Sequence, residues 1–212
     1  MALPPNASDS APISEFSVFE GTTRLVQLDS EEQIWAGLNR RCRRYIKKAE
    51  GAGAEVMDLG DFEILPKYFG WVQTTYTRAG EAVPAPLDFY RALRDLVWPK
   101  GWLLLRGTFV DDRPGTVEIF GLFNDWLYAV DSAMDREMEV EGMGNLLTWD
   151  TMRQACRRGA KNFDMLGTSI PRIAEYKQSF GGETRLALQL ELSTGAFRMA
   201  KGLIGLYERR RL

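Results

Sequence analysis

Residue types that can stabilise a developing oxyanion lie in one stretch, where a predicted strand ends in a loop and a short helix follows. The loop offers the backbone N–H groups and hydroxyls of Gly167, Thr168 and Ser169, and the helix then presents Tyr176 and Lys177. A lysine flanked by aromatic rings can hold a fixed cation against an oxyanion that develops during a reaction. The alternative interpretation is a surface lysine whose stem packs on a neighbouring ring.

A second candidate is a predicted helix that carries six positive charges within nine residues, although the whole chain has a net charge of −2. Guanidinium groups match phosphate oxygens, and such contacts release counterions, so this face suits phosphate binding. The alternative is a solvated face paired with surface acids. The six residues are Arg40, Arg41, Arg43, Arg44, Lys47 and Lys48.

Two further patterns are weaker. Gly142 and Gly144 open a predicted helix, where exposed N–H groups and the helix dipole favour anions. The pattern partly resembles the acyl-CoA loop of GNAT-type acetyltransferases, but Glu139 stands where that loop has Gln or Arg. The acidic residues from Asp131 to Glu141 lack the spacing of a calcium loop, and we predict no metal site.

The amino-acid composition excludes several classes of catalytic and metal site. The chain has 212 residues, of which 45% are hydrophobic, and it contains no histidine. This excludes a Ser-His-Asp triad, a Cys-His pair and histidine metal ligands. Cys42 and Cys156 are predicted to be buried, reduced thiols, since two cysteines alone do not complete a zinc site. Together with the lack of a secretory signal or an apolar span, this favours a cytoplasmic protein.

Elements that position these residues follow from hydrophobic periodicity and turn signals. We expect a flexible leader over residues 1–16 and a single domain over 17–212. Helices are predicted over 31–49, 61–79, 86–98, 142–158 and 173–180 and from 195 onward. Strands are predicted over 22–28, 54–59, 102–110, 115–123, 126–133, 162–166 and 184–192. The predicted fold class is α+β, with a mixed sheet, a central antiparallel meander and helices on both faces.

Several stretches, in order, resemble the Fem family, the aminoacyl-tRNA-dependent peptidyltransferases that build peptidoglycan bridges, and their FemAB-like GNAT-fold relatives. The stretches are NRRCRRYIKKAEGAGAEV, TYTRAG, GTVEIFGLFNDWLYAVDSA, GNLLTW, ACRRGAKNFDMLGTS and YKQSFGGE. Together they span roughly residues 22–192. No single motif is decisive, and the ordered set carries the resemblance.

The resemblance implies a GNAT-like fold and transfer of an acyl or aminoacyl group to an amine. It implies that Lys177 stabilises the reacting carbonyl, with Tyr176 in place of the usual Phe, and that Arg78 and Tyr128 hold the acceptor. Full Fem proteins carry two GNAT-like domains, whereas this chain resembles the second alone. A homodimer that supplies the missing domain is left open.

The leading functional hypothesis is therefore an N-acyltransferase that moves an aminoacyl or acyl group to an amine of a cell-wall precursor or similar acceptor. The donor would be aminoacyl-tRNA or acyl-CoA as a co-substrate, with no tightly bound cofactor. Direct attack by a bound amine needs positioning and oxyanion stabilisation, not a histidine. Arg43, Arg44 and Lys47 would face phosphates, including those of a tRNA. The alternatives are a non-catalytic module that binds RNA, phosphates or a partner protein, and a peripheral membrane protein.

Overall fold

The structure, a computed structural model, describes residues 17–191 except 61, 81, 84, 139 and 169. These residues form a seven-stranded sheet in the order β2-β3-β4-β5-β6-β1-β7. The strands are β1 (Ser17–Gln27), β2 (Glu55–Asp58), β3 (Leu103–Val110), β4 (Arg113–Phe123), β5 (Trp126–Met134), β6 (Asn162–Gly167) and β7 (Glu183–Glu191). The central antiparallel meander β3-β4-β5 confirms the prediction. The predicted leader and the last predicted helix lie outside the described residues.

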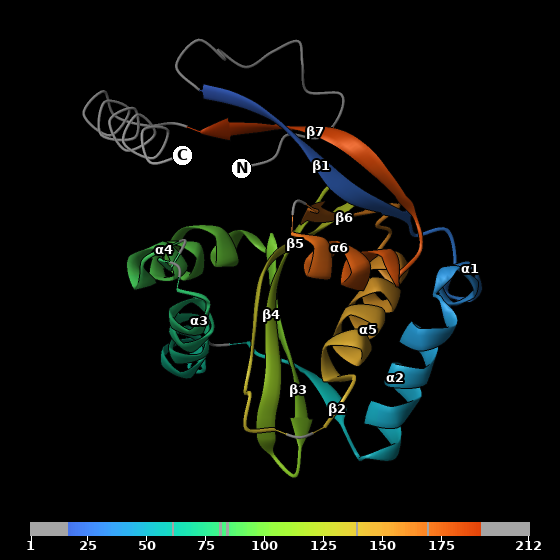
Figure 1. Cartoon of the computed structure of the whole chain (residues 1–212), viewed down its shortest axis with the longest axis horizontal. Helices are drawn as coiled ribbons and strands as arrows, with labels where there is room; N and C mark the ends of the chain where they lie inside the picture. Colours follow the sequence, from blue (N-terminus) through green and yellow to red (C-terminus); the bar gives the residue numbers. More distant parts are fainter. Residues whose placement is uncertain are drawn as a thin grey trace, which may run out of the picture.

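Helices cover both faces of the sheet, as predicted (Figure 1). One side carries α1 (Glu31–Gly37), α2 (Arg40–Gly51), α5 (Met143–Arg157) and α6 (Pro171–Gln178), and the other carries α3 (Leu65–Ala79) and α4 (Leu87–Ala92). Each layer has its own apolar core. Phe120, Phe163 and Met152 belong to the α5 side, whereas Val117 and Ile119 pack toward α3 and α4.

The helix predicted over residues 31–49 is in fact two helices, so that prediction was wrong. Leu38 adopts an extended conformation with ψ 137°, and the Asn39 side chain caps α2 by accepting a 2.8 Å hydrogen bond from the backbone N–H of Cys42. Asparagine is among the best N-cap residues. The break turns α2 so that Cys42, Ile46 and Ala49 enter the core. Its cationic residues are consequently left at the surface.

A gap opens in the sheet where its only parallel pair of described strands separates. β5 and β6 pair over just three residues, from Trp126 to Tyr128, and then diverge. A register shift between β4 and β5 lies beside this point. At the end of β6, Leu166 takes a positive φ of 58°, and its N–H donates a 2.7 Å hydrogen bond to the Asp164 carboxylate. The chain thus leaves the sheet at a sharp turn before the helix that carries Lys177.

The described residues bear on the expectations about membrane-spanning helices, metal sites and the two cysteines. Within the described ranges, no helix is both long and apolar enough to cross a membrane, and no cluster of metal-ligating side chains forms. Cys42 and Cys156 are free thiols. Cys42 is buried as predicted, whereas Cys156 is only partly buried because it lies near the end of α5.

Candidate active site

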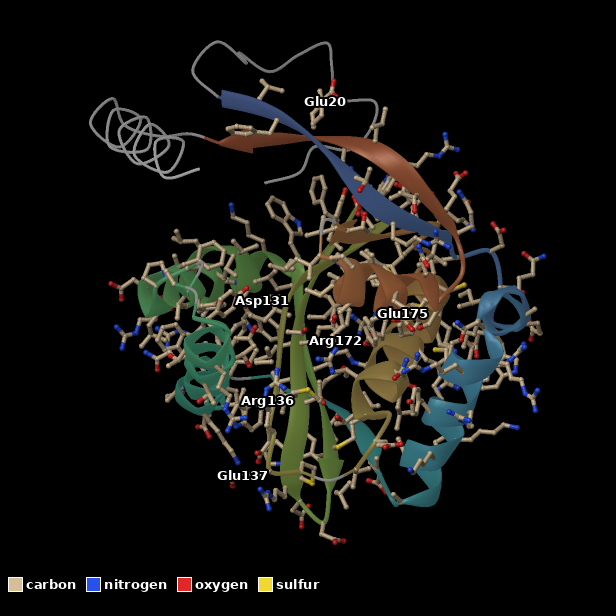
Figure 2. All side chains as sticks on the ribbon, viewed as in Figure 1. Glu20, Asp131, Arg136, Glu137, Arg172 and Glu175 are labelled. Carbon is tan, nitrogen blue, oxygen red and sulfur yellow. The ribbon has the colours of Figure 1, made fainter. Side chains whose placement is uncertain are left out.

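A pocket of about 210 Å³ lies between α2, the beginning of α5 and α6. It brings together basic, acidic, amide, thiol and hydroxyl groups from three elements that are distant in the sequence. Arg172 and Glu175 project from α6 (Figure 2). The residues that line the pocket are Asn39, Arg41, Cys42, Tyr45, Asn145, Arg172, Glu175, Tyr176 and Ser179. Three of them carry charge, and two of those three are arginines, so the pocket lining has a net positive charge.

The N-terminus of α5 opens at this pocket. Its N-cap, Gly142, has φ 88° and provides no side-chain cap, so the first-turn N–H groups depend on other partners. A Cβ at Gly142 would lie 2.2 Å from the Tyr45 carbonyl oxygen, which only glycine avoids. Gly142 therefore serves first to bring α5 against α2, and this close packing places Asn145, in the first turn of α5, at the pocket wall.

Tyr176 places its hydroxyl at the inner wall of the pocket. The residue is 37% exposed, but its hydroxyl lies 3.1 Å from the buried Thr148 hydroxyl. A Cβ on Gly144 would come within 3.4 Å of the same oxygen. Desolvation and the nearby Glu118 raise the pKa of Tyr176 above its ordinary value. Tyr176 is consequently a neutral hydroxyl that can donate a proton or a hydrogen bond at neutral pH.

Lys177 of α6 lies at the end of β6, is partly buried and is not one of the residues that line the pocket. Its Nζ donates to the carbonyl oxygens of Gly167 at 2.6 Å and Leu166 at 3.2 Å. Desolvation lowers the pKa of Lys177, and the nearby carboxyl groups of Asp164 and Glu118 oppose this shift. An ammonium group has three donors, so two are used in holding the end of β6 and one is left for another acceptor.

The predicted loop residues contribute mainly to the structure of this strand end. Thr168 donates its backbone N–H to the carbonyl oxygen of Thr22 at 3.0 Å, and the two hydroxyls lie 2.6 Å apart. Gly167 offers its carbonyl oxygen to Lys177. Ser169 lies outside the described residues. Gly167 and Thr168 therefore anchor the loop to β1 and α6, beside Lys177.

The six cationic residues of α2 differ in whether they pair with an acid and in whether they reach the pocket. Arg41 reaches the pocket and pairs with Glu175 at 2.7 Å, and Lys48 pairs with Glu141 at 2.8 Å. Arg43 is partly buried and turns back toward the Trp35 carbonyl oxygen. The predicted phosphate ligands Arg43, Arg44 and Lys47 do not line the pocket, whereas Arg41 does.

The two residues expected to hold an acceptor lie apart from the pocket. Arg78 is exposed near the end of α3, on the other side of the sheet. Tyr128 lies on β5, opposite Asp164 of β6, and its ring stacks on Trp126 with centroids 6.0 Å apart. Desolvation and the charge of Asp164 raise the pKa of Tyr128. Tyr128 thus lies next to the point where the strands separate, and Arg78 is farther along the α3 layer.

Sequence reasoning missed Glu118, Thr148 and Arg172. Glu118 is buried on β4, and the Thr148 hydroxyl lies 3.3 Å from its carboxyl group. Desolvation raises the pKa of Glu118 to about 8, and the neighbouring Asp131 contributes to this rise. A signal was available, because Glu118 interrupts the apolar run GTVEIFGLF. A carboxylate in a central strand is rarely buried without a role or a partner.

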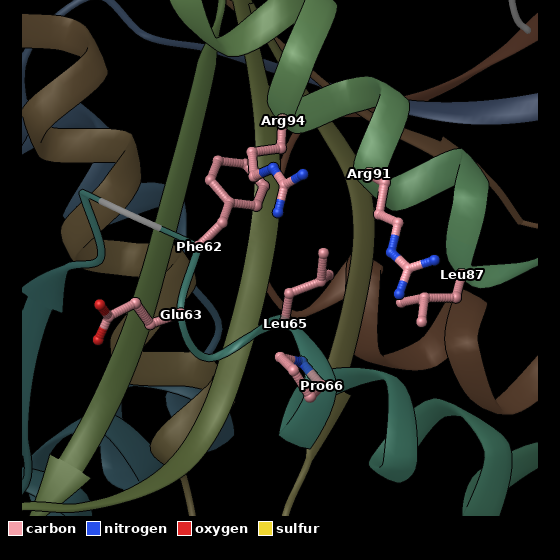
Figure 3. Close-up of a pocket in the computed structure, with 7 residues that line it drawn as sticks. All are labelled: Phe62, Glu63, Leu65, Pro66, Leu87, Arg91 and Arg94. Carbon is pink, nitrogen blue, oxygen red and sulfur yellow. The ribbon is translucent and has the colours of Figure 1, made fainter.

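A second pocket, of about 260 Å³, lies between α4 and the chain segment that leads into α3 (Figure 3). Phe62 and Leu65 supply apolar walls, and the side chains of Arg91 and Arg94 project toward it. Both arginines pair with nearby acids, Arg91 with Asp88 at 3.0 Å and Arg94 with Asp95 at 2.7 Å. It lies on the face of the sheet opposite α5, away from Tyr176 and Lys177.

Comparisons with known proteins bear on the fold. A family model described as an acetyltransferase (GNAT) domain matches residues 37–178. The chain is similar in structure to FemX, with a TM-score of 0.70 and 12% identity over 79% of this chain and 61% of that one. A protein of unknown function from Bacteroides thetaiotaomicron gives a TM-score of 0.65 and 12% identity, over 82% of this chain and 61% of that one.

The C-terminal domain of a putative lysylphosphatidylglycerol synthetase from Agrobacterium fabrum gives a TM-score of 0.57 and 13% identity, over 90% of this chain and 65% of that one. The chain therefore spans less than two thirds of the length of each of these three structures. No curated protein matches the sequence. At these identities the structures show the fold alone, and they confirm the predicted GNAT-like, FemAB-like architecture.

Proposed function

Because the chain belongs to the acetyltransferase (GNAT) domain family, we propose that it is an N-acyltransferase. It would move an acyl or aminoacyl group from an activated ester on a phosphate-bearing carrier to an amine. Acyl-CoA and aminoacyl-tRNA both have this chemistry. The resemblance to the Fem family favours an acceptor such as a cell-wall precursor.

The observation that carries the proposal is the convergence of three features at one pocket. The uncapped N-terminus of α5 and the side chains of Arg41 and Arg172 favour a phosphate group. The neutral Tyr176 hydroxyl lies beside them. A carrier bound through its phosphates would bring its ester or thioester close to a proton donor.

The reaction needs no covalent intermediate. The acceptor amine attacks the ester carbonyl, the carbon–nitrogen bond forms, and the bond to the carrier breaks. Tyr176 would give its proton to the departing oxygen or sulfur, because its raised pKa keeps the hydroxyl protonated. The remaining N–H of Lys177 would stabilise the negative oxygen of the tetrahedral intermediate. The acceptor would approach from the side of Tyr128 and Arg78.

The test is a transfer assay with acetyl-CoA and, separately, aminoacyl-tRNA as donor, together with thermal shift measurements for each. Tyr176→Phe removes only the hydroxyl, and we expect transfer to fall by about 100-fold or more, the usual scale of acid–base catalysis. Lys177→Ala should also abolish most of the activity. Lys100→Ala is the matched control, since Lys100 lies over the Trp102 ring at the surface. Full activity in Tyr176→Phe would refute the assignment of the proton donor.

A second function, tRNA binding, is favoured by the exposed cationic face of α2. Arg40, Arg44 and Lys47 are exposed there. Replacing these three by Ala should weaken tRNA binding and reduce its salt dependence, because fewer counterions are released. Replacing Arg91 and Arg94, on the other face of the sheet, is the control. A non-catalytic module would show this binding without any transfer.

A further inference from the structure

A chain of three polar groups connects the interior of the sheet to the pocket. Glu118 of β4 is 8% exposed and has its carboxyl group 3.3 Å from the hydroxyl of Thr148 on α5. The Thr148 residue is fully buried, and its hydroxyl lies 3.1 Å from that of Tyr176 on α6. Tyr176 lines the pocket. The chain thus runs from a buried carboxyl group through two hydroxyls to the wall of the proposed donor site.

The charged neighbours of Glu118 are largely engaged elsewhere. Its cross-strand partner on β3, Arg106, binds two other acids. Lys177 of α6 donates to two backbone carbonyls, and Asp131 of β5 accepts a 2.5 Å hydrogen bond from Tyr90. Tyr68 of α3 also lies within electrostatic reach. Among the described residues, no cation forms an ion pair or a hydrogen bond with Glu118, so desolvation raises its pKa to about 8, and it is mainly protonated at neutral pH.

The protonation state of Glu118 decides which way the hydrogen bonds can run. A protonated Glu118 donates to Thr148, Thr148 donates to Tyr176, and the Tyr176 hydrogen is free to point into the pocket. An ionised Glu118 can only accept, so Thr148 donates to it and Tyr176 donates to Thr148. In the second arrangement the Tyr176 hydrogen points away from the pocket.

We propose that Glu118 and Thr148 are positioning residues that orient the Tyr176 hydroxyl toward the pocket while Glu118 carries its proton. The consequence for catalysis rests on the proposed function. When Tyr176 gives its proton to the leaving group, Thr148 passes its own proton to the tyrosine oxygen and Glu118 passes its proton to Thr148. The net donor is Glu118, and the proton released by the attacking amine restores it through solvent.

The orientation can be tested without a substrate. The full chain is labelled with ¹³C at the tyrosine ring carbon that bears the hydroxyl and at the glutamate carboxyl carbon, and spectra are followed from pH 5 to 10. Tyr176→Phe and Glu118→Gln assign the two signals. We expect the Glu118 signal to titrate near pH 8 and the Tyr176 signal to shift with the same midpoint, although the tyrosine itself stays protonated.

Two variants separate the chain from a structural effect. Glu118→Gln keeps a permanent N–H donor toward Thr148, so the Tyr176 signal should no longer shift near pH 8. Thr148→Val should abolish the Tyr176 shift while Glu118 still titrates. A Glu118 midpoint near the ordinary glutamate value, or a Tyr176 signal that does not move with Glu118, would overturn the proposal. An unchanged coupling in Thr148→Val would do the same.

The activity assay adds a readout that distinguishes this proposal from the proposed function. With a donor that supports transfer, the wild-type rate should fall as pH rises through about 8. The Glu118→Gln rate should be lower than that of the wild type at pH 6, because Gln has no proton to pass on, and it should lack the fall near pH 8, because Gln holds Tyr176 in one orientation. If neither acetyl-CoA nor aminoacyl-tRNA supports transfer while the two NMR signals remain coupled, the proposed function fails and the orienting chain stands. If transfer occurs and the two signals are uncoupled, the orienting chain is wrong.

Discussion

Arg106 and Glu118 occupy matching positions on neighbouring strands and yet have opposite surroundings. They face each other across β3 and β4 and are both buried beneath α5. Arg106 donates to Asp58 at 2.5 Å, to Thr151 at 2.9 Å and to Asp150 at 2.9 Å. The Glu118 carboxyl group has one hydrogen-bond partner among the described residues, the Thr148 hydroxyl at 3.3 Å. Arg106 is thus paired with two carboxylates and a hydroxyl, whereas Glu118 has only a neutral hydroxyl as its partner among the described residues.

The difference separates a group that holds the fold from a group suited to chemistry. A buried charge with complete partners stabilises one arrangement of the elements around it, here β2, β3 and α5. Partial burial disfavours ionisation of Asp58, but the hydrogen bond and charge of Arg106 lower its pKa below the ordinary value. Glu118 is forced toward its neutral form instead. A proton held near neutral pH is useful for catalysis and costly for stability.

The largest expected effect of this contrast is a pH dependence of stability. Folded Glu118 holds its proton up to about pH 8, whereas in the unfolded chain it releases it near 4.5. Rising pH therefore favours unfolding across this window. The free energy of unfolding of the wild type should fall relative to that of Glu118→Gln by about 1.4 kcal/mol for each pH unit between these values. Urea unfolding at several pH values measures the difference, and a constant difference would contradict the assignment of Glu118.

Removing Arg106 should be the next largest effect, and it should not depend on a titration near neutral pH. Arg106→Ala leaves two carboxylates and a threonine hydroxyl without their shared donor, and we expect a loss of about 3–5 kcal/mol in the free energy of unfolding. The matched control is Arg91→Ala, which breaks an exposed pair with Asp88 and should cost less than about 1 kcal/mol. Equal losses in the two variants would show that Arg106 is not the centre of a stabilising network.

The sequence predicted the architecture well because local patterns determine most of it. Apolar alternation placed β3, β4 and β5, and the turn at Asp111 and Asp112, both with positive φ, fits its turn signal. It failed at Leu38, because periodicity continued through the break while the Asn39 cap decided the structure. Local competition between a cap and a continuing helix is not visible in the spacing of apolar residues.

The site was less predictable because it depends on contacts between distant segments. The closeness of Lys177 to Gly167 could be expected, since the loop and the short helix are adjacent in the chain. Glu118 contacts Thr148, which lies 30 residues farther along the chain, and Thr148 in turn contacts Tyr176, a further 28 residues along. The number of cations in α2 does not indicate which of them reaches the pocket. Arg41 lines the pocket, and Arg43 does not. Burial and pairing of this kind arise only when the helices pack on the sheet.

The smallest expected effects compare two threonines that lie one helical turn apart on α5. The Thr151 hydroxyl accepts from Arg106 at 2.9 Å and donates to the carbonyl oxygen of Leu147 at 2.8 Å. The Thr148 hydroxyl instead contacts the carboxyl group of Glu118. Thr151→Val leaves a buried guanidinium N–H without an acceptor, so it should lower the free energy of unfolding by about 1.5–3 kcal/mol.

Thr148→Val removes a long hydrogen bond to a carboxyl group that is mainly neutral, and it should cost only about 1 kcal/mol at pH 6. Both substitutions exchange a hydroxyl for a methyl group in the same helix, so helix propensity and volume are matched. Parallel urea unfolding at pH 6 gives the comparison. If Thr148→Val costs as much as Thr151→Val, then Glu118 is ionised at that pH. Its surroundings would then resemble those of Arg106, and the contrast between the two strand positions would disappear.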